Sequence, residues 1–146
     1  MKAILPLAVS LAIMSCGGKR HAMHDAIEKC VGGFSEAYFN YDLAQAMAYC
    51  TADSRPWIEF AASNIRQSDI DALNGKSRPA EVEVESVDYN EGDTTGTAVV
   101  EIRNYLLNDS IDGQAHIVEK AHARLRFVVR GKECLVRMEG LPQSGM

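Results

Sequence analysis

The sequence lacks an excess of basic residues, a cysteine–histidine spacing typical of zinc sites, and an apolar run long enough to cross a membrane. Its 146 residues include 20 acidic and 15 basic side chains, and the resulting net charge of −5 argues against a nucleic-acid-binding module. Hydrophobic residues make up 47% of the chain, too many for an intrinsically disordered protein. We therefore expect one globular domain with no nucleic-acid partner.

Residues 1–15 have the pattern of a signal peptide, in which Lys2 precedes a short apolar stretch. That stretch falls short of the roughly 20 residues of a membrane-spanning helix. It leads into Ile13-Met14-Ser15-Cys16, which resembles the bacterial lipoprotein box. In lipoproteins with this box, the cysteine thiol receives a diacylglycerol and the chain is cut before the cysteine. The new amine is then acylated by a fatty acid such as palmitate.

The resemblance implies that an acylated Cys16 anchors the protein to membrane lipid. Several acyl chains give stable anchoring because each buried methylene contributes about 0.8 kcal/mol. Gly17-Gly18 follows the cysteine, without the aspartate that resembles an inner-membrane retention signal. We expect an outer-membrane lipoprotein of the bacterial cell envelope that faces the periplasm, with a lipidated tether over residues 16–22. An ordinary cleaved signal peptide with a chance cysteine is the alternative.

Apolar residues at steps of three and four predict an amphipathic helix from Met23 to about Tyr41. Asp42 can cap a second, short helix. A third helix begins near Thr51–Pro56, where capping residues and an early proline coincide. A capping-box pattern at Ser68–Asp71 then opens one or two more helical turns, which Asn74-Gly75 ends. The expected buried side of the third helix consists of Trp57, Phe60, Ala61 and Ile65.

After Pro79 the apolar residues alternate with a period of two, which predicts a four-stranded antiparallel meander. A two-residue turn at Asp112-Gly113 sets the register of the middle hairpin, with Leu106 opposite Glu119 and Ala98 opposite Phe127. Turns at Gly92-Asp93 and Gly131-Lys132 set the outer hairpins, with Val87 opposite Ala98 and Val129 opposite Cys134. Keeping the valines of the first strand on one face requires a β-bulge near Glu85-Ser86. The predicted fold is α+β, with the N-terminal helices packed on a curved sheet. This single roll domain covers residues 23–140 and leaves a C-terminal tail over 141–146.

The order and spacing of these elements are similar to those of the nuclear-transport-factor-2-like fold, a cone-shaped, cystatin-like roll. The similarity rests on the segments Phe34–Tyr38 and Asp42–Met47, the Cys50-Thr51 junction and the final hairpin at Gly131-Lys132-Glu133. More narrowly, the chain resembles small bacterial lipoproteins of unknown function that carry this domain. The resemblance covers Met23 to Met138 and implies a pocket between the sheet and the helices.

We expect this pocket to bind a small apolar ligand or an envelope protein without catalysis and without a cofactor. A homodimer formed through the open sheet face is a further expectation. The alternative is a pocket enzyme, because ketosteroid-isomerase-like relatives pair a carboxylate base with a tyrosine hydroxyl that stabilises an oxyanion. Glu119 with Tyr38 or Tyr41 would imitate that pair. The pocket candidates are Glu119, Asn104, Tyr38, Tyr41 and Trp57.

Besides Cys16, the chain contains Cys30, Cys50 and Cys134, an odd number for an oxidising compartment. On two antiparallel helices Cys30 and Cys50 would lie at similar heights, so a disulfide between them is one expectation. Buried free thiols are the other. The segment Asn108–Glu119 matches a calcium-binding loop only in part, and we expect no metal site.

Overall fold

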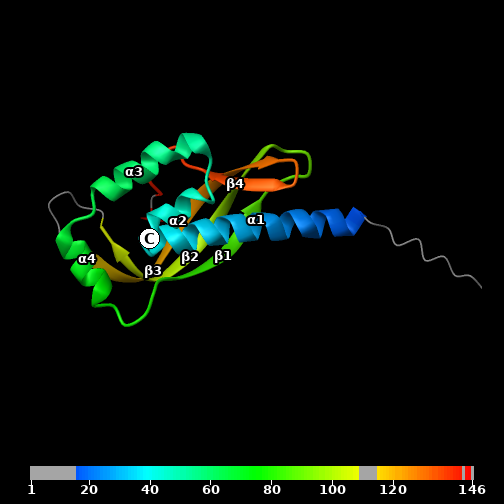
Figure 1. The fold of residues 1–146 in the computed structure, drawn as a ribbon. Helices are drawn as coiled ribbons and strands as arrows, with labels where there is room; N and C mark the ends of the chain where they lie inside the picture. The colour runs from blue at the N-terminus through cyan, green and yellow to red at the C-terminus, as the bar shows by residue number, and fades with distance from the viewer. Residues whose placement is uncertain (1–15, 109–114, 143, 146) are drawn as a thin grey trace, which may run out of the picture.

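The computed structural model describes residues 16–108, 115–142, 144 and 145. Within this part of the chain, helices come first and strands follow. The helical elements are α1 (Cys16–Phe39), α2 (Leu43–Met47), the 3-10 turn η1 (Ala52–Ser54), α3 (Arg55–Ser63) and α4 (Gln67–Asn74). The strands are β1 (Glu81–Asp88), β2 (Thr95–Leu107), β3 (His116–Arg130), β4 (Glu133–Arg137) and β5 (Ser144–Gly145). The predicted α+β class is confirmed, with the helices on one face of a curved antiparallel sheet (Figure 1).

The long helix α1 carries the predicted apolar face, on which Ile27, Val31 and Phe34 are buried. It begins at Cys16, so residues 16–22, expected to form the lipidated tether, are helical. A helix already held by packing extends into its flanking residues easily, because each added residue needs no new nucleation. Among the described residues, no helix is both long enough and apolar enough to cross a membrane.

A sharp reversal joins α1 to α2. Tyr41 has a φ of 62°, and the Asp42 carboxylate accepts a hydrogen bond from the Gln45 N–H at 3.3 Å. Asp42 is therefore the N-cap of α2, as predicted. The Asn40 side chain ties this reversal to the start of the sheet, since its Oδ1 accepts from the Ala80 N–H at 2.8 Å and its Nδ2 donates to the Ala80 carbonyl at 3.1 Å.

The buried side predicted for α3 is wrong. Ile58 is buried, whereas the Trp57 side chain is 37% exposed and that of Phe60 is 51% exposed. A tertiary contact at the start of the helix sets its rotation, because the buried Ser54 hydroxyl accepts from the Met138 N–H at 2.8 Å. Ile58 follows Ser54 by one turn and so faces the same way, toward the core.

Capping of α4 also differs from the prediction. The helix follows Arg66, whose N–H donates to the Asp69 carboxylate at 2.8 Å. Asp69, rather than a residue of a box opened by Ser68, therefore caps this helix. The predicted end is confirmed, since Gly75 is the C-cap.

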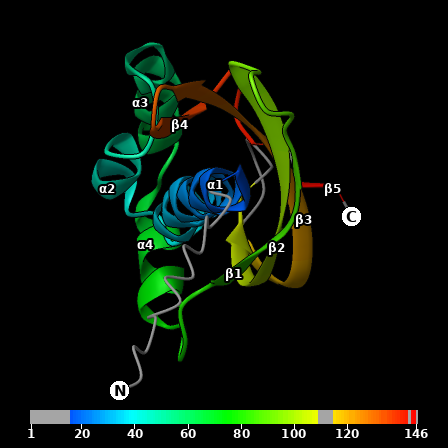
Figure 2. The same cartoon turned by 90° about the vertical axis from the view of Figure 1, so that its right-hand side faces the viewer.

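The sheet has the order β1-β2-β3-β4, with β5 beside β3. The registers predicted for the outer hairpins are confirmed by the pairs Val87–Ala98 and Val129–Cys134. The β-bulge predicted near Glu85-Ser86 lies between Val84 and Ser86. The sheet curves around α1 (Figure 2), which is the bend that we expected from this bulge.

The register predicted for the middle hairpin is wrong by two residues. Leu106 pairs with Ile117 rather than with Glu119, and Ala98 pairs with Leu125 rather than with Phe127. A shift of two leaves the alternation of side chains between the two faces unchanged, so the apolar pattern fits both registers equally well. The Asp112-Gly113 turn that suggested the other register lies outside the described residues.

The β2–β3 ladder is interrupted at Asn104, which has a φ of 56°. Regular pairing resumes on either side, with Arg103 opposite Lys120 before it and Tyr105 opposite Val118 after it. Asparagine adopts this left-handed backbone conformation more readily than most other non-glycine residues.

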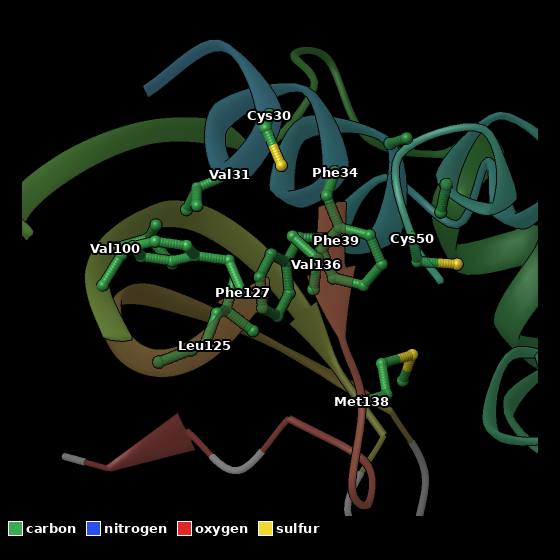
Figure 3. Packing of buried hydrophobic residues seen from close by; sticks show 14 of the residues in the cluster. Cys30, Val31, Phe34, Phe39, Cys50, Val100, Leu125, Phe127, Val136 and Met138 are labelled. Carbon is green, nitrogen blue, oxygen red and sulfur yellow. The ribbon is translucent and has the colours of Figure 1, made fainter. Parts of the chain in front are cut away.

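The core lies between α1 and the inner face of the sheet (Figure 3). Phe34 from α1 and Phe127 from β3 are among its largest fully buried side chains. Gly96 allows β2 to approach this layer, because a Cβ there would lie 2.5 Å from Cζ of Phe127 and 2.7 Å from the Asp88 carbonyl oxygen. Any larger residue at position 96 would push the strands apart.

Candidate functional site

A groove with a volume of about 490 Å³ lies between the first half of α1 and the end of the β1–β2 hairpin. We call it the α1–β1 groove. Ligand-binding pockets commonly have volumes of about 300–1,000 Å³. The residues that line the groove are Met23, His24, Ile27, Val87, Tyr89, Asn90 and Glu91.

The hairpin end that forms one wall of the groove is held in a defined shape. Across the turn, the Asp93 N–H donates to the Asn90 carbonyl at 2.9 Å, and the Asn90 N–H donates to the Asp93 carboxylate at 3.2 Å. Gly92 has a φ of 92°, which favours glycine at this position. The Tyr89 ring packs against Phe127 with centroids 5.9 Å apart. The wall is therefore preformed and continuous with the core.

Apolar and polar side chains are separated within the groove. Ile27 is buried, and the half-buried Met23 and Val87 pack against the core cluster. His24 and Glu91 are exposed at the rim. His24 Nδ1 lies 3.8 Å from the Glu28 carboxylate, one helical turn away. Such a groove suits a ligand with an apolar body and a polar end, and its rim shows no buried acid–base pair.

Tyr38 and Tyr41 line a second, smaller cavity of about 80 Å³, together with Tyr105 and Asn108. Burial raises the pKa of both Tyr38 and Tyr41, so their hydroxyls stay protonated. The Tyr41 hydroxyl donates to the Leu106 carbonyl at 2.6 Å. The Tyr41 hydroxyl thus serves as a hydrogen-bond donor, and the cavity is too small for a ligand of drug size.

The predicted partner of these tyrosines, Glu119, is exposed and does not line this cavity. The acidic group near Tyr41 is instead Asp69, which is 2% exposed and contributes to the raised pKa of Tyr41. Its carboxylate accepts hydrogen bonds from the Arg66 N–H and from Nδ2 of Asn108, both at 2.8 Å. Asp69 thus caps α4 and ties it to the residue that follows β2. The helix-capping pattern around position 69 was the one sequence signal for a buried carboxylate here.

Two further pocket candidates lie elsewhere. Nδ2 of Asn104 donates to the Arg78 carbonyl at 2.8 Å, and Lys76 Nζ donates to the Asn104 carbonyl at 2.6 Å. Asn104 therefore fastens β2 to the loop before β1. Trp57 lies partly exposed on α3 and lines neither the α1–β1 groove nor the tyrosine cavity. Of the five predicted residues, only the two tyrosines share a cavity.

The cysteines that the fold brings together are not the predicted pair. Cys30, Cys50 and Cys134 are all free thiols, but the Cys30 thiol interacts with that of Cys134. The Cys50 thiol donates instead to the Met47 carbonyl at 3.6 Å, and its sulfur points away from Cys30 (Figure 3). The expectation of a Cys30–Cys50 disulfide is not met.

A group of charges on the outer face of the sheet surrounds Glu101, which is only 5% exposed. Its carboxylate accepts from Arg103 Nε at 2.5 Å and lies 3.4 Å from Lys120 Nζ. The Arg103 hydrogen bond, with further help from neighbouring groups, lowers the pKa of Glu101 to about 2. Glu85 and His122 lie close enough to form a metal-ligand set with Glu101. Arg103 and Lys120 already neutralise the Glu101 carboxylate, so this group of charges is best explained as pairing between neighbouring strands.

Comparison with known proteins gives no relative for this chain. No protein-family model matches it, and neither a curated protein nor a solved structure matches it significantly. The resemblance to nuclear-transport-factor-2-like lipoproteins therefore stays a prediction from the sequence.

Proposed function

We propose that this chain is a membrane-anchored bacterial lipoprotein that binds a small apolar ligand in the α1–β1 groove. The observation that carries the proposal is the groove itself, preformed between helix and sheet and lined by apolar side chains with a polar rim. A pocket enzyme with Glu119 as base finds no support, because Glu119 is exposed.

The position of the groove along α1 also supports the proposal. Met23 and Ile27 follow Cys16 by about two to three helical turns, so they lie about 10–17 Å along the helix axis from the proposed lipid anchor. Figure 1 shows the first turns of α1 extending beyond the sheet. A groove this close to an anchored residue is accessible to ligands that partition into the membrane or gather at its surface.

Ligand binding is tested with N-phenyl-1-naphthylamine, an apolar probe that fluoresces when it leaves water. We expect the full chain to give a saturable titration, and Met23→Asp to weaken binding about tenfold or more, because a carboxylate then replaces part of the apolar wall. Phe60→Asp is the matched control, since it removes an exposed apolar side chain on α3, outside the groove. Equal losses in both variants, or no saturation, would contradict the proposal.

The anchor is tested separately, in a bacterial host supplied with radiolabelled palmitate. The wild-type chain should carry the label and sediment with membranes, and Cys16→Ser should lose both properties. Cys50→Ser is the control, because it removes a thiol but leaves the lipoprotein box intact. Label retained by Cys16→Ser would refute acylation at this residue. Two expectations remain, a homodimer formed through the sheet and an envelope protein as partner. The sedimentation rate of the same preparations tests both.

A further inference from the structure

The cysteines of α1 and β4 lie on facing surfaces of the core. Cys30 is 6% exposed on the face of α1 that also buries Val31. Cys134 lies at the start of β4, opposite Val129, and packs against the same core cluster. It alternates with the fully buried Val136 and therefore points to the same side of the strand.

The two side chains face each other where α1 packs on β4. The Cys30 thiol interacts with that of Cys134, and each thiol shifts the pKa of the other. Figure 3 shows the Cys30 side chain directed from α1 toward the sheet. Cysteines that face each other from two packed elements can reach the S–S length of about 2.05 Å by side-chain rotation.

The two cysteines also differ in their exposure to solvent and in how readily they form a thiolate. Cys134 is half-buried and so within reach of solvent, whereas Cys30 is enclosed. Their interaction raises the pKa of Cys30, together with burial, and lowers the pKa of Cys134. The accessible cysteine is thus the one that more readily forms the reactive thiolate.

We propose that Cys30 and Cys134 form a disulfide that joins α1 to β4, while Cys50 stays a free thiol. The Cys134 thiolate attacks a disulfide-containing oxidant and releases one thiol of that oxidant. Cys30 then loses its proton and displaces the second thiol from the mixed disulfide. The protein gives up two protons and two electrons, and the oxidant's disulfide becomes two thiols. The inference rests on the proposed envelope location only for the supply of this oxidant.

Such a bond would stabilise a wall of the α1–β1 groove. Cys30 follows Ile27, a groove residue, by about one turn of the same helix. A covalent link at this level would hold that part of α1 against the sheet during local opening. The bridge therefore reinforces the binding site without touching the ligand.

The test uses the full chain with Cys16→Ser, which removes the lipidated thiol, oxidised by glutathione disulfide. After denaturation and alkylation, we expect one alkylated cysteine, and a tryptic peptide Glu133–Arg137 linked to the peptide that begins at Cys30. That second peptide also contains Cys50, so Cys50→Ser decides which cysteine is bridged. The variant should keep the link and lose the remaining alkylation.

Three alkylated cysteines after oxidation would overturn the proposal, as would a bridge that disappears in Cys50→Ser. Neither measurement depends on replacing the buried Cys30, so a folding defect does not obscure the result. The reaction is carried out on purified protein and does not depend on where the protein resides. Its failure is therefore distinguishable from a failure of lipid anchoring or of probe binding.

Discussion

Two adjacent glycines in the middle of α1 allow a direct test of its packing. A glycine inside a helix costs about 1 kcal/mol relative to alanine. At Gly32 an added Cβ would meet only Cγ2 of Val84, at an ordinary 3.8 Å. At Gly33 it would lie 2.6 Å from two ring atoms of Tyr49, closer than any real contact. Neighbouring residues with the same intrinsic propensity should therefore respond in opposite directions.

We expect Gly32→Ala to raise the free energy of unfolding by about 0.5–1 kcal/mol, since the helix gains propensity without a clash. Gly33→Ala should lose that gain, because the half-buried Tyr49 ring must move, and overpacking of this kind costs about 1–3 kcal/mol. The two variants should differ by roughly 1–3 kcal/mol, most of which comes from one ring.

Urea denaturation followed by circular dichroism measures both free energies. The Tyr49→Ala background serves as the control, because without the ring Gly33→Ala should become as favourable as Gly32→Ala. If Gly33→Ala stabilises the wild-type chain as much as Gly32→Ala does, α1 does not pack against Tyr49 and the reasoning fails.

Two further predictions concern single polar contacts. Tyr41→Phe should lower the free energy of unfolding by about 1 kcal/mol, because the Leu106 carbonyl loses its donor; no change in a urea titration would mean that water replaces the hydroxyl. The lowered pKa of Glu101, about 2 against an ordinary 4.5, implies stability that is complete above about pH 4.5 and lost as pH falls toward 2. Urea midpoints of wild type and Glu101→Gln should therefore converge over that range, and a constant difference would contradict the ion pairing.

The sheet could be predicted from sequence wherever two independent signals agreed. The first and last hairpins combined a turn dipeptide with an apolar pattern, and their registers are confirmed by Val87–Ala98 and Val129–Cys134. The valine pattern also located the bulge after Val84. In the middle hairpin only the turn dipeptide distinguished between registers two residues apart, because each side chain points to the same face of the sheet in both registers.

The candidate site was harder to predict because it depends on contacts between distant parts of the chain. The orientation of α3, and with it the exposure of Trp57, follows from a hydrogen bond between Ser54 and Met138. The turn residues that close the α1–β1 groove carry no periodic signal of their own. Cys30 and Cys134 are far apart in sequence, and only the packing of α1 on β4 shows that they meet.

One helix, α1, links the proposed anchor, the groove and the proposed disulfide. Because a helix rises about 1.5 Å per residue, Cys16, Met23 and Cys30 lie in that order at intervals of about 10 Å along one axis. Membrane attachment at the first position and a bridge to the sheet at the last would fix both ends of the helical segment that carries the groove wall. A chain that binds the probe but lacks palmitate would retain the groove and lose only its placement. A labelled chain that binds no probe would instead show that α1 serves to hold the domain at the membrane.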